Sequence, residues 1–407
     1  MPCETGSIAV DLLNHAGLNW PQRRLLGQLG RLRCGRLEVD FAGGRRVLLS
    51  GPEQGPSASM TIQRPGALLR RLLWRGDLGF AEAYIAGDWS SADPAGLLAL
   101  VARNIDSYAA TGRRHPLAQV LVSAQHWLNR NSRRGSRRNI AAHYDLGNAF
   151  YAQWLDPGMT YSAAMFEPGD SLARAQSRKY ARILATLAAR PGDHILEIGC
   201  GWGGFAEYAA QQGMRVTAIT LSREQLAFAR ARTERAGLAQ LVELRLCDYR
   251  DLAGTFDHIV SIEMFEAVGQ DYWQGYFDTL TRCLKSGGRV ALQVITIDQG
   301  RFARYAANPG GFIQRYIFPG GMLPTKGHLA QLGAAAGLHH RETRAFGIDY
   351  ADTLAAWHAA FNASTAWLER HGYDRRFRRM WRYYLAFCEA GFRTGHIDVV
   401  HCTFSKA

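Results

Sequence analysis

The chain has 407 residues, of which 47% are hydrophobic and 20% are charged, an ordinary globular composition that is long enough for two domains. Lys and Arg outnumber Asp and Glu by 48 to 35, for a formal net charge of +13. This excess favours an anionic partner, whether nucleic acid, a phospholipid surface or an acidic substrate. The seven cysteines form no CxxC pair, which argues against a disulfide framework and a structural zinc site.

The first residues, Met1 to Asp11, lack a basic start followed by an apolar run, so a secretory signal is not expected. No stretch approaches the ~20 apolar residues that a bilayer-spanning helix needs. We therefore expect a cytoplasmic protein with reduced thiols, whose contact with the inner face of the cell membrane is peripheral.

Residues 1–110 are predicted to form a small α+β domain. Apolar side chains alternate at Leu37, Val39 and Phe41, a Gly-Gly pair follows at 43–44, and residues 47–49 lead back, which is typical of a hairpin. Residues 60–62 favour another strand, and residues 65–74 and 80–85 favour short helices. No set of catalytic residue types stands out in this part of the chain.

Residues 111–138 are predicted to be a basic linker. No acidic residue occurs between Ser107 and Tyr144, and residues 117–128 could form an amphipathic helix. Such a segment can be a solvated tether between domains or a contact with anionic phospholipid headgroups. No nucleic-acid-binding motif accompanies the charge, so a nucleic-acid partner is not expected. The basic residues are Arg113, Arg114, Arg130, Arg133, Arg134, Arg137 and Arg138.

From residue 139 to the C-terminus, candidate strands alternate with helical segments such as 172–188 and 223–236. This alternation predicts an α/β domain with a Rossmann-like parallel sheet and helices on both faces. The candidate strands are 194–198, 215–220, 242–246, 258–262, 289–295 and 399–404.

A glycine motif follows the first of these strands. Glu197 precedes Gly199, Gly201 and Gly203, and a helix begins near Phe205. Glycines at this place let the backbone turn sharply and approach a ligand closely. A carboxylate before them suits a cationic amino-acid group better than a phosphate. The pattern resembles motif I of the class I methyltransferases, which bind S-adenosylmethionine.

Residues after the next two strands support this cofactor. Thr220, Leu221 and Gln225 stand where such enzymes contact the ribose, and Asp248 and Tyr249 stand where they flank the adenine. A glycine turn at 284–288 precedes the fifth strand. These features together predict S-adenosylmethionine binding; each alone could be ordinary loop chemistry.

Four further segments resemble the cyclopropane-fatty-acyl-phospholipid synthases and the related mycolic-acid methyltransferases. The resemblance covers roughly residue 139 to the C-terminus, and residues 79–89 (GFAEAYIAGDW) also resemble the lipid-binding domain of the full-length bacterial enzymes. The family therefore implies an S-adenosylmethionine-dependent enzyme that acts on double bonds of membrane lipids. The four segments are 142–148 (AHYDLGN), 159–162 (MTYS), 262–269 (IEMFEAVG) and 316–324 (YIFPGGMLP).

The resemblance also implies roles for particular residues. It places Tyr161 and Ser162, with Gly199 and Gly201, at the methionine part of the cofactor, Ile262 in the cofactor pocket and Gln225 at the ribose. It further implies a bicarbonate ion beside the transferred methyl group. The ligands of that ion map onto the backbone of Ala163 and Ile295 and onto the side chains of Glu266, Gln293 and Tyr350.

Two residues at the implied anion site depart from the family pattern. The family usually has Cys at Ala163 and His at Gln293. Alanine preserves a backbone contact, but glutamine cannot carry a charge or relay a proton as histidine can. The anion site is therefore expected to be weaker or altered. The common His at Ala267 is also replaced.

The expected reaction transfers a carbon from S-adenosylmethionine to the double bond of an unsaturated phospholipid acyl chain. A carbocation forms, and bicarbonate-assisted loss of a proton closes a cyclopropane ring. The alternative is C-methylation without ring closure, which leaves a methyl-branched or methyl-olefinic chain. Lipid binding without catalysis and methylation of a small soluble molecule are weaker hypotheses. No metal is expected, and full-length relatives suggest a homodimer.

Overall fold

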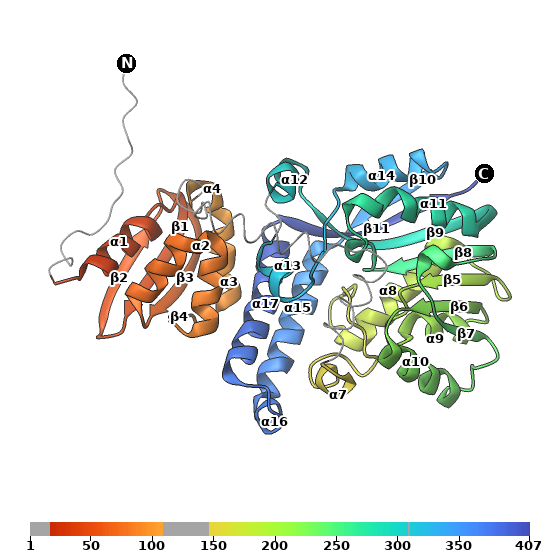
Figure 1. Cartoon of the computed structure of the whole chain (residues 1–407), viewed down its shortest axis with the longest axis horizontal. Helices are drawn as coiled ribbons and strands as arrows, with labels where there is room; N and C mark the ends of the chain where they lie inside the picture. The colour runs from red at the N-terminus through yellow and green to blue at the C-terminus, as the bar shows by residue number, and fades with distance from the viewer. Residues whose placement is uncertain (1–16, 109–145, 308–309) are drawn as a thin grey trace, which may run out of the picture. The chain divides into compact units, whose positions relative to one another are not determined.

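The computed structural model describes residues 17–108, 146–307 and 310–407. The chain divides into two compact units (Figure 1). The first takes in Met1–Gln125 and Thr365–Thr394, and the second takes in His126–Ser364 and Gly395–Ala407. None of the described helices is long and apolar enough to cross a bilayer.

The first unit is built on a four-stranded sheet with the order β2-β1-β3-β4. The predicted hairpin is confirmed, since β1 pairs antiparallel with β2, and β3 then runs parallel to β1. Leu37, Val39 and Phe41 of β1 are all buried, as their alternation predicts. The strands are β1 (Cys34–Phe41), β2 (Arg45–Ser50), β3 (Glu53–Ile62) and β4 (Trp89–Ser90).

The two short helices predicted at 65–74 and 80–85 form one kinked helix, α2 (Pro65–Ala86). Gly76 forms the kink with a non-helical backbone, φ 54° and ψ −128°. The chain comes so close to itself there that a Cβ on Gly79 would lie 2.0 Å from the carbonyl oxygen of Arg71. The other helices before residue 109 are α1 (Trp20–Leu29), α3 (Pro94–Arg103) and α4 (Ile105–Tyr108).

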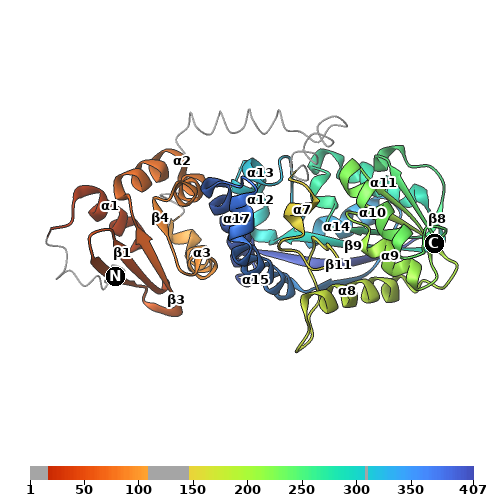
Figure 2. The same cartoon turned by 90° about the horizontal axis from the view of Figure 1, so that it is seen from below.

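The first unit is completed by two helices from far along the chain, α16 (Thr365–Arg370) and α17 (Arg375–Arg393). α17 packs against α2 and α3 (Figure 2). The guanidinium of Arg379 lies 4.1 Å from the ring centre of Tyr84 and donates a hydrogen bond to the carbonyl of Trp89 at 2.8 Å. Residues 365–394, which lie within the segment predicted as one catalytic domain over 139–407, therefore group with the N-terminal unit, where α17 packs on α2 and α3.

The second unit contains a seven-stranded sheet with the order β10-β11-β9-β8-β5-β6-β7. The five strands from β5 to β9 pair in parallel, while β11 is antiparallel to β9 and to β10. β9 starts earlier than predicted, so it includes the glycines expected in a preceding turn. The strands are β5 (His194–Ile198), β6 (Arg215–Thr220), β7 (Val242–Leu246), β8 (Phe256–Ile262), β9 (Leu284–Ile297), β10 (His339–Ala345) and β11 (Ile397–Ser405).

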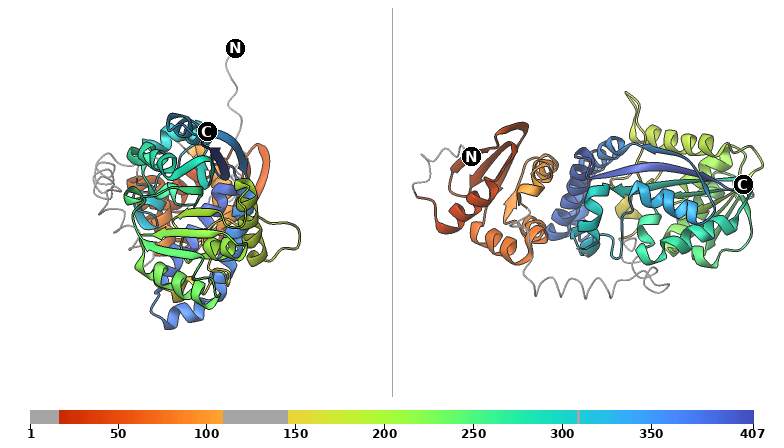
Figure 3. Two further views of the ribbon diagram at one scale, coloured as in Figure 1. Left: turned by 90° about the vertical axis from the view of Figure 1, so that its right-hand side faces the viewer. Right: turned by 90° about the horizontal axis from the view of Figure 1, so that it is seen from above.

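Helices cover both faces of this sheet, which confirms the predicted fold class (Figure 3). Ile195 of β5 packs in one core with helices α8, α9 and α10, and its neighbour Leu196 packs in the opposite core with α11 and α14. Adjacent strand residues point to opposite faces, so one strand supplies both cores. These helices are α8 (Leu172–Leu187), α9 (Gly204–Gln211), α10 (Arg223–Arg235), α11 (Trp273–Cys283) and α14 (Lys326–Ala335).

Shorter helices and one long helix lie outside this alternation. They are α7 (Asn148–Tyr151), α12 (Gln299–Ala306), α13 (Phe312–Tyr316), α15 (Gly347–Ala363) and the 3₁₀ turns η2 (Tyr249–Asp251), η3 (Phe265–Ala267) and η4 (Gln270–Tyr272). β5, β6, β7 and β8 all end at the same edge of the sheet, which is where open α/β sheets bind their ligands.

Candidate active site

The loop between β5 and α9 carries the three glycines of the predicted cofactor motif. Their φ angles are +87° at Gly199, +50° at Gly201 and +81° at Gly203, a region that L side chains rarely adopt. A Cβ on Gly203 would lie 2.9 Å from that of Ala229, so this glycine is needed for helix packing. A Cβ on Gly201 would have no heavy atom within 4 Å, which leaves open space for a ligand beside the backbone.

Glu197 lies in β5, two residues before this loop, and its side chain is only 2% exposed. Within the described residues its Oε2 has no hydrogen-bond partner. Burial raises the pKa of the Glu197 carboxyl to about 8, against the opposing influence of Lys179 and Arg232. A buried carboxylate with one unpartnered oxygen suits the ammonium group of S-adenosylmethionine, which would supply the missing hydrogen bond and charge.

Aromatic rings surround the predicted methionine contacts. The ring of Tyr161 lies 5.5 Å from that of Tyr151, 5.4 Å from Trp154 and 5.3 Å from Trp357. Trp202 of the glycine loop lies 5.0 Å from Tyr151, which joins the loop to this cluster. Aromatic faces attract cations, so the cluster suits a sulfonium group.

Lys179 is a buried lysine that was not among the predicted site residues. Its Nζ donates a hydrogen bond to the hydroxyl of Ser162 at 2.6 Å, and the residue is fully buried. Burial lowers the pKa of Lys179 to about 7, while the carboxylates of Glu263, Asp156 and Glu197 oppose this shift. A lysine among the buried positions of α8 was the available signal in the sequence.

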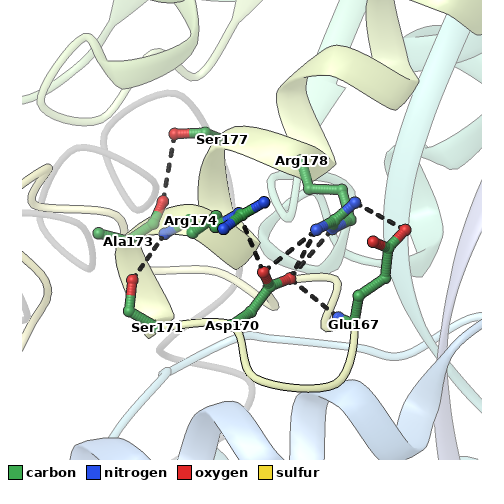
Figure 4. A network of polar contacts seen from close by, with 7 residues as sticks. All are labelled: Glu167, Asp170, Ser171, Ala173, Arg174, Ser177 and Arg178. Atoms are coloured by element: carbon green, nitrogen blue, oxygen red, sulfur yellow. Dashed lines mark hydrogen bonds and ion pairs between the residues drawn. The ribbon is translucent and has the colours of Figure 1, made fainter.

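A network of polar contacts ties the turn before α8 to the helix that carries Lys179 (Figure 4). Asp170 accepts a hydrogen bond from the backbone N–H of Glu167 at 2.9 Å and pairs with Arg178 at 2.8 Å and Arg174 at 3.2 Å. The Glu167 N–H is the largest cause that lowers the pKa of Asp170. The network holds the first two turns of α8 against the preceding loop.

The residues predicted at the ribose lie at the end of β6 and the start of α10. Thr220 donates a hydrogen bond to Gln225 Oε1 at 3.2 Å, and its own hydroxyl accepts one from the backbone N–H of Ser222 at 3.1 Å. Thr220 and Gln225 are buried, and Leu221, which follows Thr220 in the sequence, is half-buried. The structure therefore brings these residues to the carboxyl edge beside the glycine loop.

The residues predicted at the adenine follow β7 at the same edge. Both oxygens of Asp248 accept hydrogen bonds from Arg250, at 2.8 and 2.7 Å, and Asp248 is 1% exposed. Tyr249 packs on Tyr276 with 5.1 Å between ring centres. Asp248 thus has a structural partner, Arg250, that was not predicted from the sequence, and its contact with adenine stays a prediction.

Glu263, which was not among the residues predicted from the sequence, lies at the centre of the predicted anion site. Its Oε1 accepts hydrogen bonds from the backbone N–H of Ala163 at 2.8 Å and from Gln293 Nε2 at 2.7 Å. Its Oε2 accepts one from the hydroxyl of Tyr350 at 2.6 Å. Three of the five predicted bicarbonate ligands thus donate to one carboxylate of the protein.

Glu266, the residue predicted to orient the anion, makes a different contact. Its Oε1 accepts a hydrogen bond from the backbone N–H of Ile295, and its Oε2 has no partner among the described residues. Burial raises the pKa of Glu266 to about 8, with a smaller contribution from the charge of Glu263. The four predicted donors therefore divide between two carboxylates, three at Glu263 and Ile295 at Glu266, the fifth predicted ligand. Ile262 lies directly before them, as the last residue of β8.

The profile of the family described as mycolic acid cyclopropane synthetase matches residues 131–402. The chain belongs to this family. It is similar to the tuberculostearic acid methyltransferase UfaA1 of Mycobacterium tuberculosis, with 40% identity over 366 residues that span 88% of this chain and 85% of the relative. The cyclopropane-fatty-acyl-phospholipid synthase of Escherichia coli K12 is 34% identical over 360 residues, 86% of this chain and 88% of the relative.

A solved structure agrees with this assignment. The mycolic acid cyclopropane synthase CmaA1, complexed with SAH and CTAB, is 30% identical and superposes with a TM-score of 0.62 over 66% of this chain and 98% of the other. The protein is therefore an S-adenosylmethionine-dependent methyltransferase of the cyclopropane synthetase family, as the motifs predicted.

A separate bicarbonate ion does not fit the site of this enzyme as the structure has it. The donors expected to hold the ion at Ala163, Gln293 and Tyr350 are already engaged by the carboxylate of Glu263. A free ion would have to displace a carboxylate that is attached to the chain at the same place.

The raised pKa of Glu197 predicts that cofactor binding releases a proton. The pKa of Glu197 is about 8 before binding, and a bound ammonium group favours the ionised carboxylate. Between pH 6 and 7, affinity should therefore rise with pH by roughly tenfold per unit. Calorimetry in buffers of different ionisation enthalpy should count close to one proton released.

The matched variants are Glu197→Gln and Glu243→Gln. The first should bind more weakly and lose the proton release, because an amide does not titrate in this range. The second changes an exposed carboxylate on β7 that pairs with Arg245 and should keep both. Proton release that persists in Glu197→Gln would assign the linkage to another group.

Proposed function

We propose that this enzyme transfers a one-carbon unit from S-adenosylmethionine to the double bond of an unsaturated acyl chain in a membrane phospholipid, to form a cyclopropane ring. The observation that carries the proposal is the pair of half-buried glutamates, Glu263 and Glu266, which follow β8 beside the cofactor strand β5. Desolvation raises the pKa of both carboxyl groups. Relatives named as cyclopropane synthases over most of the chain support the lipid substrate.

The chemistry explains the need for buried negative charge. S-adenosylmethionine supplies an electrophilic methyl group. The π electrons of the alkene form the new carbon–carbon bond, the carbon–sulfur bond breaks with its electrons going to sulfur, and the second alkene carbon becomes a cation. Carboxylates in a site of low dielectric stabilise such a cation strongly. Removal of a proton from the new methyl group lets its C–H electrons close the ring.

A second candidate, C-methylation without ring closure, has an observation of its own. The relative with 40% identity over 88% of this chain is named a tuberculostearic acid methyltransferase. The same cation would lose a proton from the neighbouring chain carbon, and the C–H electrons would form a new double bond. The reaction needs the same carboxylates and differs only in which proton is removed.

Product analysis decides between the two candidates. Purified enzyme should be incubated with S-adenosylmethionine and vesicles of a monounsaturated phospholipid. Each modified acyl chain should become ~14 Da heavier, because the transfer adds one CH₂ group. Because both products have the same mass, proton NMR must separate them. Upfield ring protons with loss of the olefinic protons identify the cyclopropane, and a new methyl signal with retained olefinic protons identifies the methylated alkene. No mass gain in any unsaturated lipid would refute the proposed function.

We also propose that the first unit contacts the membrane surface through α1 and α2, which pack together. Leu73 and Trp74 of α2 are 51% and 54% exposed, and Trp20 of α1 is 66% exposed. Exposed arginines accompany them, namely Arg70 on α2 and Arg23 and Arg24 on α1. Apolar side chains beside basic ones suit an anionic bilayer. The linker arginines Arg133, Arg134, Arg137 and Arg138 lie outside the described residues.

Replacing Leu73 and Trp74 with serine should lower binding to phosphatidylglycerol-containing vesicles at least ~10-fold, because two large apolar side chains no longer enter the interface. Co-sedimentation measures the binding, and the remaining electrostatic attraction should fall as salt is added. Leu48→Ser is the matched control, because Leu48 is 52% exposed in the same unit but lies on β2. An equal loss of vesicle binding in both variants would contradict the proposal that α1 and α2 form the membrane-contacting surface.

A further inference from the structure

Glu263 occupies the place where a small carboxylate ion was expected. Its two oxygens accept hydrogen bonds from three separate parts of the chain: the backbone of Ala163, the amide of Gln293 on β9 and the hydroxyl of Tyr350 on α15. A bicarbonate ion would offer these donors the same kind of acceptor, two oxygens on one carbon. The acceptor here belongs to the protein.

We infer that Glu263 is the catalytic base of this enzyme and takes the place of a free bicarbonate ion. The inference rests on the proposed function and deepens it, because it names the group that removes the proton from the carbocation. It also accounts for the departure at residue 293, since a glutamine amide can donate to a carboxylate that is already present.

The backbone at Glu263 shows that the surrounding structure holds this residue in an unfavourable conformation. Its φ angle is +49°, and only two other non-glycine residues in the described part of the chain, Met159 and Ala188, have positive φ. The backbone N–H of Glu263 donates to the carbonyl of Gln293 at 2.8 Å, which fixes the residue to β9. Strained backbone that the surroundings maintain is concentrated at active sites.

A neighbouring histidine contacts the other end of the Gln293 amide. His401 Nε2 lies 2.9 Å from Gln293 Oε1, and His401 Nδ1 has no partner among the described residues. Burial lowers the pKa of His401 to about 3, so the ring is neutral. Because the ionised Glu263 carboxylate can only accept, the Gln293 nitrogen must face it and the Gln293 oxygen must face His401, which places the proton of the neutral ring on Nε2.

The remaining features of Glu263 suit a base. Burial raises the pKa of its carboxyl, while Tyr350, Ala163, Gln293 and Lys179 favour the ionised form. In the proton-removal step, a Glu263 oxygen forms an O–H bond and the broken C–H bond leaves its electrons on the substrate, where they close the ring or form a double bond. The carboxylate becomes a carboxylic acid and the cation becomes neutral, so no other reactant is required.

The test compares wild type with Glu263→Gly and Glu263→Gln, using S-adenosylmethionine, vesicles of an unsaturated phospholipid and buffer stripped of carbon dioxide. Wild type should turn over equally with and without added bicarbonate. Glu263→Gly should fold, because glycine favours φ near +49°, and should lose turnover at least ~100-fold. Added formate or bicarbonate should raise the turnover of Glu263→Gly at least ~10-fold, since either anion fits the space that the side chain leaves.

Two variants separate the loss of the base from changes in side-chain volume and backbone. Glu263→Gln keeps the side-chain volume without a base, so it should be inactive and should gain nothing from formate. Ala188→Gly places glycine at another position with positive φ, at the end of α8, and should keep full turnover. Wild-type turnover that depends on added bicarbonate, or full turnover in Glu263→Gly, would overturn the inference.

A measurement of bicarbonate binding tests the inference in the absence of lipid. Carbon-13 NMR of labelled bicarbonate should show binding to Glu263→Gly and none to wild type. If wild type modifies no unsaturated lipid but this difference is found, the proposed function fails and the placement of Glu263 in the anion site stands. If wild type binds bicarbonate as well as the variant does, the inference fails whatever the lipid assay shows.

Discussion

Replacing Gly201 with valine should abolish binding of S-adenosylmethionine while the protein stays folded. A Cβ at this position meets no protein atom within 4 Å, so the branched side chain would enter only the space reserved for the ligand. We expect the dissociation constant to rise at least ~100-fold, which corresponds to about 2.7 kcal/mol. Titration calorimetry measures the affinity, and thermal unfolding reports whether the variant is folded.

Backbone strain must be separated from the loss of ligand space, because Gly201 has φ +50°. Gly237 is the matched control: its φ is +68°, a Cβ there would also meet no atom within 4 Å, and it follows α10 away from the glycine loop. Both valine variants should lose about 1–2 kcal/mol of stability from the left-handed backbone. Only Gly201→Val should lose the cofactor. Unchanged affinity in a folded Gly201→Val protein would show that the loop does not bind it.

Tyr350→Phe should slow turnover roughly 10- to 100-fold without weakening cofactor binding. The Tyr350 hydroxyl donates to Glu263 Oε2 at 2.6 Å, and the variant loses this hydrogen bond to a charged group. Such bonds contribute about 1.5–3 kcal/mol, and each ~1.4 kcal/mol on the barrier is a tenfold change in rate. Steady-state kinetics with vesicles at saturating S-adenosylmethionine measure the effect.

The pH profile of the same variant distinguishes a role in proton removal from a structural one. Tyr350 lowers the pKa of Glu263, so its loss raises that pKa and reduces the ionised fraction at a given pH. The acid limb of the turnover profile should therefore move to higher pH, and the deficit should shrink as pH rises. Tyr383→Phe removes a buried hydroxyl in the first unit and should leave the profile in place. An equal deficit for Tyr350→Phe at every pH would indicate loss of packing only.

Much of the fold could be predicted from local patterns. Alternation of Leu37, Val39 and Phe41 located the hairpin, and alternating strands and helices after residue 139 located the Rossmann-like sheet. Both signals depend on neighbours within a few residues, where the period of a strand or helix determines which side chains share a face. The glycine motif after β5 was equally local, since the turn and the ligand approach involve consecutive residues.

Contacts between distant segments could not be predicted in this way. Local patterns placed α17 in the catalytic domain, but this helix packs on α2 and α3 of the first unit, where Arg379 contacts Tyr84. They marked Lys179 only as a lysine among the buried positions of α8 and did not connect it with its partner Ser162, which lies 17 residues away. Such a side chain becomes part of a site only when folding brings distant segments of the chain into contact with it.

The two glutamates after β8 show most clearly the difference between what local sequence patterns predict and what the tertiary structure decides. Their position after a buried strand and the family resemblance placed a carboxylate at the reacting carbon, and Glu266 was chosen. The tertiary structure instead brings Ala163, Gln293 and Tyr350 to Glu263, from positions 100, 30 and 87 residues away in the chain. Two carboxylates three residues apart are chemically identical in the sequence. Their difference arises from the donors that folding places around each, because hydrogen bonds depend on distance and direction in space.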